Sequence, residues 1–417
     1  MGAHHHHGDG GHGADDAAFD PALRRLLRWL AAGLGVLTLV GLAVLWPGGE
    51  ARTDVGSLGV SDTSYAATVT RVDEFVCPGE EDLTTDPDAQ AGLPDGDEDY
   101  FDGVPSLCLE LTFRLDEGPD EGEERTLELF DVGSQPEYSV GDGIVVPYLG
   151  AADEAFRYSP QIERERGWPM LLLAFLFAAL VVVQGRWRGL SALAGLVASI
   201  AVIVVFVLPA LIEGAAPVPV AVVAASTIAF LALYLAHGPS PLTTVALLGT
   251  LSSLVLVTAL SWVFTQLTTL SGLSEETQYL RAFGGDLDFG GLLLAGMILG
   301  ALGALDDMTV TQASAVAELR GANPSYGFAE LYRAGGRIGR DHVASTVNTL
   351  ALAYAGASLP LLLVFVSSEQ TFGRVLTSEI VAIEIVRTLV GSIGLVASVP
   401  ITTALAARLV GRSAPTG

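Results

Sequence analysis

The chain has 417 residues, of which 50% are hydrophobic and only 16% are charged, and its mean hydropathy is +0.49. Soluble domains carry about 25% charged residues, so this composition excludes an ordinary water-soluble enzyme. The formal net charge of −26 excludes a nucleic-acid-binding protein, because such a protein needs a basic face. Thirty of the 47 acidic residues lie between Glu50 and Arg166, so one acidic segment accounts for nearly all of the net charge.

Residues 1–29 are expected to form a flexible, histidine-rich cytoplasmic N-terminus. Five histidines lie in its glycine-rich beginning, namely His4, His5, His6, His7 and His12. A metal-binding role and a cloning remnant both fit this pattern. No cofactor is expected for the chain, apart from protons as a coupling ion.

Eight apolar segments are long enough to cross a bilayer core, which takes roughly 20 helical residues. They are Leu30–Trp46, Trp168–Gln184, Leu190–Ile212, Pro217–Ala236, Leu242–Gln266, Phe289–Val316, Ser345–Val366 and Ile380–Ala407. The first is interpreted as an uncleaved anchor (residues 30–48), since no small-residue cleavage site precedes Trp46. The other seven form a membrane domain over residues 168–410, followed by a cytoplasmic tail at 411–417.

The arginines predict the orientation of these spans, because positively charged loops stay in the cytoplasm. Arginines precede the first span, occupy the short loop at 184–189 and cluster at 320–340 and 408–412. With eight spans, all of these segments fall on one side. We therefore predict a multi-pass protein of the bacterial plasma membrane with both termini cytoplasmic.

Residues 49–167 then lie outside the cell as an acidic β domain inserted between spans 1 and 2. Strand-like runs alternate there with turn residues, at Tyr65–Val76, Leu107–Leu115, Arg125–Val132 and Gly143–Leu149. The Gly141-Asp142-Gly143 turn suits a tight connection, since glycine supplies positive φ. The expected fold is a small β-barrel-like, OB-like domain with an acidic insertion at 78–105.

The only two cysteines, Cys77 and Cys108, both lie in this domain and flank the insertion. On the oxidising side of the membrane they are predicted to form a disulfide that closes the inserted loop. The alternative is a pair of buried thiols.

The main candidate site is Asp306-Asp307 in the sixth predicted span, where ionisable groups are costly and mark function. Adjacent helix positions point about 100° apart, so one aspartate can face a polar core and the other a neighbouring helix. Buried, adjacent carboxyls can bind and release protons near neutral pH. Together with the hydroxyls of Thr309 and Thr311 they suggest a proton relay. Alternatively, the span ends before Asp306 and the pair begins a cytoplasmic segment, or the pair binds a cation.

Polar residues of the last two spans are secondary candidates. Asn348 lies inside the seventh span, where its amide needs partners, and we include it in the relay. Arg340 either obeys the positive-inside bias or pairs with the aspartates, and His342 either relays protons or only donates a hydrogen bond. Glu384 and Arg387 share one helix face at i, i+3; they form an internal ion pair or line a path from outside.

No nucleophile elbow, P-loop, dinucleotide fingerprint or zinc-ligand spacing occurs in the sequence, so no enzyme is expected. Two segments, GALDDMTVTQASAVAEL (Gly303–Leu319) and GGRIGRDHVASTVNTLALAYAGASLPLLL (Gly335–Leu363), together with GDGIVV and HGPSP, resemble the YibE/F-like family of bacterial integral membrane proteins. That family is presumed to include permeases, so the resemblance implies that this chain is a permease. More distantly, the chain resembles one half of an RND-type or SecD-like proton-driven protein, which implies that Asp306 and Asp307 carry protons. One half of such an RND-type or SecD-like protein has five spans after the outer domain, whereas seven are expected here.

The sequence thus predicts a multi-pass permease, in the form of a proton-coupled secondary transporter or transport accessory for a small molecule or ion. The alternative is a membrane scaffold whose outer β domain binds an envelope partner. Expected partners are the lipid bilayer and a second copy or a paralogous membrane protein, and no nucleic acid is expected.

Overall fold

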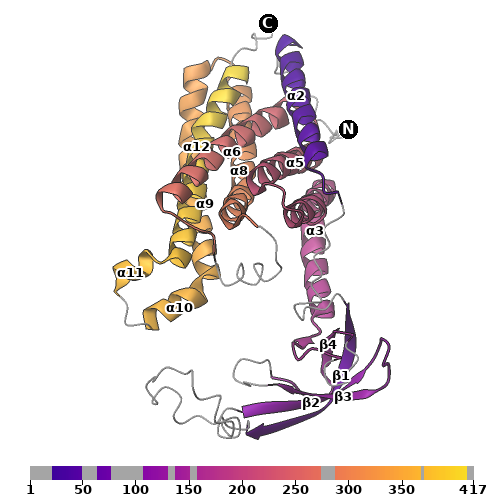
Figure 1. Cartoon of the computed structure of the whole chain (residues 1–417). Helices are drawn as coiled ribbons and strands as arrows, with labels where there is room; N and C mark the ends of the chain where they lie inside the picture. Colours follow the sequence, from indigo (N-terminus) through magenta and orange to yellow (C-terminus); the bar gives the residue numbers. More distant parts are fainter. Residues whose placement is uncertain are drawn as a thin grey trace, which may run out of the picture. The chain divides into compact units, whose positions relative to one another are not determined.

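The computed structural model describes residues 21–48, 63–76, 107–129, 137–150, 157–273, 287–367 and 371–410. The chain divides into two compact units. One comprises Thr53–Phe177 and contains the strands; the other comprises Met1–Arg52 and Ala178–Gly417 and contains most of the helices. Figure 1 shows the elements of each unit.

The first unit is built on a five-stranded antiparallel sheet with the strand order β3-β2-β1-β4-β5. Its strands are β1 (Thr63–Val76), β2 (Leu107–Leu115), β3 (Glu124–Leu129), β4 (Gly143–Tyr148) and β5 (Glu163–Arg164). The four predicted strands are therefore confirmed to within a few residues. The two-residue β5 was missed, because so short a strand carries no alternating pattern.

One face of this sheet forms the core of the unit. Leu111 and Phe113 of β2 and Ile144 and Val146 of β4 are fully buried, each two positions from the next, as strand geometry requires. Gly141 takes φ +94°, which confirms the tight turn before β4. The order leaves β3 and β5 at the two edges, so the OB-like closure remains a prediction.

The second unit is helical. Its elements are α2 (Pro21–Leu45), α3 (Gly167–Val202, whose first residues belong to the strand unit), a π-helical stretch (Ile203–Val207), α4 (Leu208–Ile212), α5 (Pro217–His237), α6 (Pro241–Leu267), α8 (Phe289–Ala322), α9 (Phe328–Ala357), α10 (Leu359–Ser367), α11 (Phe372–Leu376) and α12 (Glu379–Val410). Helix α8 packs against α5, α6, α9 and α12 (Figure 1).

Six helical stretches in the described part of the chain are long and apolar enough to cross a membrane. This supports a membrane protein, whereas the sequence predicted eight spans. Part of the difference is that two predicted spans are counted together as Gly167–Ile212. The predicted seventh span is likewise divided between α9 and α10, and neither of these helices is among the six.

Helix α3 is broken at Arg186, which has φ 51° and ψ −129°. In an unbroken helix Val181 and Gly189 would be about 12 Å apart along the axis. Here a Cβ on Gly189 would lie 2.3 Å from the carbonyl oxygen of Val181. The chain therefore turns sharply at Arg186, and only a glycine fits at position 189.

Helix α9 begins at Phe328 and runs without interruption to Ala357, 17 residues earlier than the predicted span at Ser345. Its first turns are buried against the bundle at Leu331, Ala334 and Gly335. The sequence did not predict this extension, because arginines and glycines interrupt the apolar pattern there.

Candidate functional site

The two adjacent aspartates lie halfway along α8, which continues as a regular helix for 15 residues beyond Asp307. The neighbours of Leu305, the preceding residue, show the depth of this position. A Cβ on Gly394 of α12 would meet the side chains of both Leu305 and Val257 of α6. Gly394 and Val257 each lie near the middle of their helices. The aspartates are therefore at mid-height in the α6–α8–α12 bundle.

Asp306 is half-buried on α8. Its Oδ1 atom is buried and has no hydrogen-bond partner among the described residues. The nearby Thr309 hydroxyl donates to the backbone carbonyl of Asp306 at 3.0 Å and lies 2.6 Å from the hydroxyl of Thr250 on α6. An unpaired buried carboxyl oxygen is costly unless a proton or cation neutralises it, so Asp306 is suited to bind one.

Asp307 has a different environment. Its side chain is 71% exposed, and its Oδ2 lies 3.8 Å from Nε2 of His342 on α9. That nitrogen is itself buried without a hydrogen-bond partner in the described structure. The two adjacent carboxyls thus point to different surroundings, and His342 is the sequence-predicted residue that the fold places beside them.

The other predicted relay residues, and the secondary candidate Arg340, differ in their exposure. Thr309 is fully buried, whereas Thr311, Arg340 and Asn348 are exposed. Within the described segments, no hydrogen bond or ion pair links these last three to the aspartates. Of the sequence-predicted candidates, the described structure thus places Thr309 and His342 next to the aspartates.

Glu384 and Arg387 form an ion pair on α12, with Nη1 and Oε1 2.5 Å apart, as their spacing predicts. Both side chains are about a quarter exposed. The Tyr354 hydroxyl of α9 interacts electrostatically with both charges. It also packs over Gly300 of α8, where a Cβ would lie 3.3 Å away. This polar group lies about 10 Å along α8 from the aspartates, at the 1.5 Å rise per residue of a helix.

Sequence reasoning missed Gln312, which joins three helices. Its Nε2 donates to the carbonyl of Gly335 at 2.8 Å and to the hydroxyl of Thr403 at 2.7 Å, and the side chain is 2% exposed. Gly335 and Gly339 leave room for it, since a Cβ on either would contact the Gln312 amide. The signal available in the sequence was a polar residue six positions after Asp306, together with the paired glycines at 335 and 336 farther along the chain.

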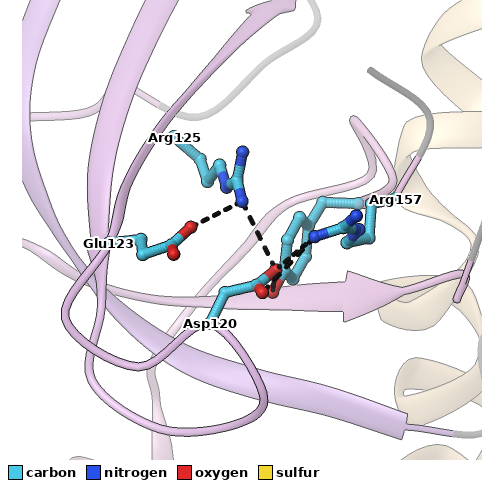
Figure 2. Close-up of polar contacts among 5 residues, drawn as sticks. Asp120, Glu123, Arg125 and Arg157 are labelled. Carbon is cyan, nitrogen blue, oxygen red and sulfur yellow. Dashed lines mark hydrogen bonds and ion pairs between the residues drawn. The ribbon is translucent and has the colours of Figure 1, made fainter. Parts of the chain in front are cut away.

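The strand unit contains a separate ion-pair cluster, drawn in Figure 2. Asp120, in the β2–β3 turn, lies 3.3 Å from Arg157 and 3.6 Å from Arg125, and it accepts a hydrogen bond from the Tyr158 hydroxyl at 2.9 Å. This hydrogen bond, with help from the two arginines, lowers the pKa of Asp120. The cluster pins the turn to the segment before β5, so we assign it a structural role.

Several predicted residues lie outside the described residues, including His4, His5, His6, His7, His12 and Cys77. Cys108 is fully buried in β2, opposite Phe75 of β1. The disulfide therefore stays a prediction. In the described part of the chain, no three His, Cys, Asp or Glu side chains are arranged to hold a metal ion.

Comparison with known proteins identifies a family. A family model described as YibE/F-like protein covers residues 173–412, more than half of the chain and the whole of the aspartate site. No curated protein and no solved structure matches the chain.

Proposed function

Because this chain belongs to the YibE/F-like protein family, we propose that it is a membrane permease in which Asp306 and Asp307 carry the coupling proton. It would act as a secondary transporter, or as an accessory to one, for a small molecule or ion. The observation that carries this proposal is the unpaired, buried Oδ1 of Asp306 at mid-height in a bundle of apolar helices.

The two carboxyls suit a two-state mechanism. Protonation removes the charge that makes a buried, unpaired carboxylate costly, so it would favour a bundle state in which Asp306 is enclosed. Asp307 and His342, 3.8 Å apart on neighbouring helices, provide a second proton-exchanging pair closer to the surface. Proton transfer between these groups would couple bundle movement to the proton gradient.

We further propose the eight-span arrangement, with both termini in the cytoplasm of a bacterium and the β unit outside. The sharp turn at Arg186 supports two crossings within Gly167–Ile212, and the 39 residues of α9 and α10 provide enough length for another. An OB-like barrel and a Cys77–Cys108 disulfide belong to the same proposal.

The test is to measure proton flux into liposomes that contain the purified protein. We expect the Asp306→Asn/Asp307→Asn double variant to lose most of the flux, because neither amide can carry a proton. Glu121→Gln is the matched control, since it makes the same carboxyl-to-amide change at an exposed turn residue of the strand unit. Unchanged flux in a folded double variant would contradict the proposal.

A second candidate function is a scaffold that binds an envelope partner. Asp73, Glu110 and Glu128 lie directly opposite one another across β1, β2 and β3. Such like-charged neighbours destabilise a sheet, so the row favours contact with a basic surface. Proton flux that is no greater with the folded chain or the folded double variant than in empty liposomes would leave this function as the better explanation.

A further inference from the structure

The surface of α8 that faces away from the bundle is unlike a lipid-facing surface. Seven residues between Gly291 and Arg320 are exposed, and each is a glycine or a polar residue: Gly296, Gly300, Gly303, Asp307, Thr311, Ser314 and Glu318. Their spacing of three or four residues places them on one face. We call this face the α8 stripe; it extends over about 33 Å, the thickness of a bilayer core.

Other helices of the same unit expose bulky apolar side chains. Val255 and Trp262 of α6 are 70% and 58% exposed, and Leu389 of α12 is 56% exposed. Such residues suit contact with lipid tails. The described residues of α8 expose no large hydrophobic side chain. The α8 stripe is therefore suited to contact with another helix rather than with lipid.

Between Arg337 and Asn348, the exposed residues of α9 are mostly polar as well, with Ile338 as the large apolar exception. The polar ones, which we call the outer face of α9, include Arg337, Arg340, Asp341, Ser345 and Asn348. Across the stripe and this face, acidic and basic side chains occur in nearly equal number. None of Glu318, Arg337, Arg340 and Asp341 has an ion-pair partner among the described residues.

From these two faces we infer that the partner that covers them is a second copy of this chain, packed through the α8 stripe and the outer face of α9. A twofold interface uses the same surface on both subunits, so the surface must be complementary to itself. A face that carries both signs of charge, unpaired within its own chain, meets this requirement. Gly296 and Gly303, where nothing lies within 4 Å of a Cβ, allow a neighbouring backbone to approach closely, as at many helix interfaces in membranes.

The depth of the charges fits this arrangement. A Cβ on Gly335 would lie 2.9 Å from Val316, so these two positions are level within the chain. Because α8 and α9 run antiparallel, Glu318 and Arg337 each lie two residues from this level but on opposite sides of it, about 6 Å apart in depth. A twofold axis along the membrane normal keeps each residue at the same depth in the membrane in both copies. It would therefore bring Glu318 of one copy within about 6 Å in depth of Arg337 of the second, a difference that these two long side chains can span.

Cysteine crosslinking tests the surface. In membranes treated with a bifunctional thiol reagent, Ser314→Cys on the stripe should give a species of twice the chain mass. Val255→Cys, on the apolar face of α6, should not, and the unaltered chain controls for Cys77 and Cys108. Equal crosslinking of both variants, or a product of another mass from Ser314→Cys, would overturn the inference.

Charge exchange tests the pairing without relying on one variant. Glu318→Arg and Arg337→Glu should each weaken dimerisation in lipid at least about tenfold, as breaking an interfacial charge pair does, and the double exchange should restore it. Restoration cannot come from a merely misfolded single variant. Dimerisation that is unchanged by both single exchanges, or not restored by the double exchange, would refute the assigned pairing.

Discussion

Single residues decide how the helices of this protein approach one another. Gln312 illustrates the point, because its amide bridges a backbone carbonyl of α9 and a hydroxyl of α12. Both hydrogen bonds depend on glycines at 335 and 339, which leave space beside the amide. The local sequence reads as an ordinary helix at each position, and only the contact between helices gives these residues their role.

The glycine at 339 allows a direct test. A Cβ there would lie 2.4 Å from Val399 and 2.8 Å from Gln312, whereas nothing lies within 4 Å of a Cβ at Gly336. We expect Gly339→Ala to destabilise the protein by about 1–3 kcal/mol through overpacking. Gly336→Ala should leave stability unchanged or raise it, because alanine favours helix. Thermal unfolding in detergent measures both, and equal melting temperatures would show that α9 does not pack as described.

Protonation of Asp306 can be detected directly. We expect infrared difference spectra, recorded across a pH change, to contain the carbonyl stretch of a protonated carboxyl group, and Asp306→Asn to remove it. The reason is that its buried Oδ1 has no donor among the described residues. Glu121→Gln, at an exposed turn position, should leave the band in place. A band that persists in Asp306→Asn would assign proton binding to another group.

At the scale of elements, the β2–β3 turn shows how charge can fix a loop. Gly118 within it has φ +102°, and a Cβ there would collide with the ring of Tyr65 at 2.7 Å. Asp120 then holds the turn to Arg157 and Tyr158 (Figure 2). The turn is therefore packed closely over the aromatic side chains beneath it.

This contact makes the turn sensitive to acid. The pKa of Asp120 is lowered in the folded chain, first by the Tyr158 hydrogen bond and then by the arginines. Its contribution to stability is therefore present above the pKa of the unfolded chain and is lost as the pH falls through the lower, folded value. We expect hydrogen-exchange protection of the turn, corrected for intrinsic rates, to fall in acid.

Asp120→Asn should already show weaker protection at neutral pH, with little further loss in acid. Glu121→Gln, its exposed neighbour, should follow the unaltered chain. If Asp120→Asn and the unaltered chain lose protection in parallel, another group governs the acid response. Asp142, whose pKa is lowered by the backbone N–H of Ser139 and by Arg164, is then the next candidate.

For the whole molecule, the proposed membrane topology depends on the break in α3 at Arg186. If the chain reverses at Arg186, Gln184 and Ala215 lie on opposite faces of the membrane. A membrane-impermeant thiol reagent added to intact cells should then label Ala215→Cys but not Gln184→Cys, and both after the cells are opened. The unaltered chain gives the background from its two cysteines. Labelling of Gln184→Cys in intact cells would reverse or abolish the proposed orientation.

Much of this architecture is determined by sequence, because its signals are local. Alternating side chains placed four strands within a few residues, and apolar length located the spanning helices. The aspartate pair was identified from sequence because a charge within a long apolar run is costly wherever it lies.

The tertiary structure decided what local patterns cannot encode. It gave Asp306 and Asp307 different surroundings, brought His342 to one of them, and buried Gln312 against two glycines of another helix. It also left a polar face of α8 uncovered, although the same residues in sequence read only as interruptions of an apolar helix. The physical reason is that burial and pairing depend on which neighbouring helix lies opposite each side chain.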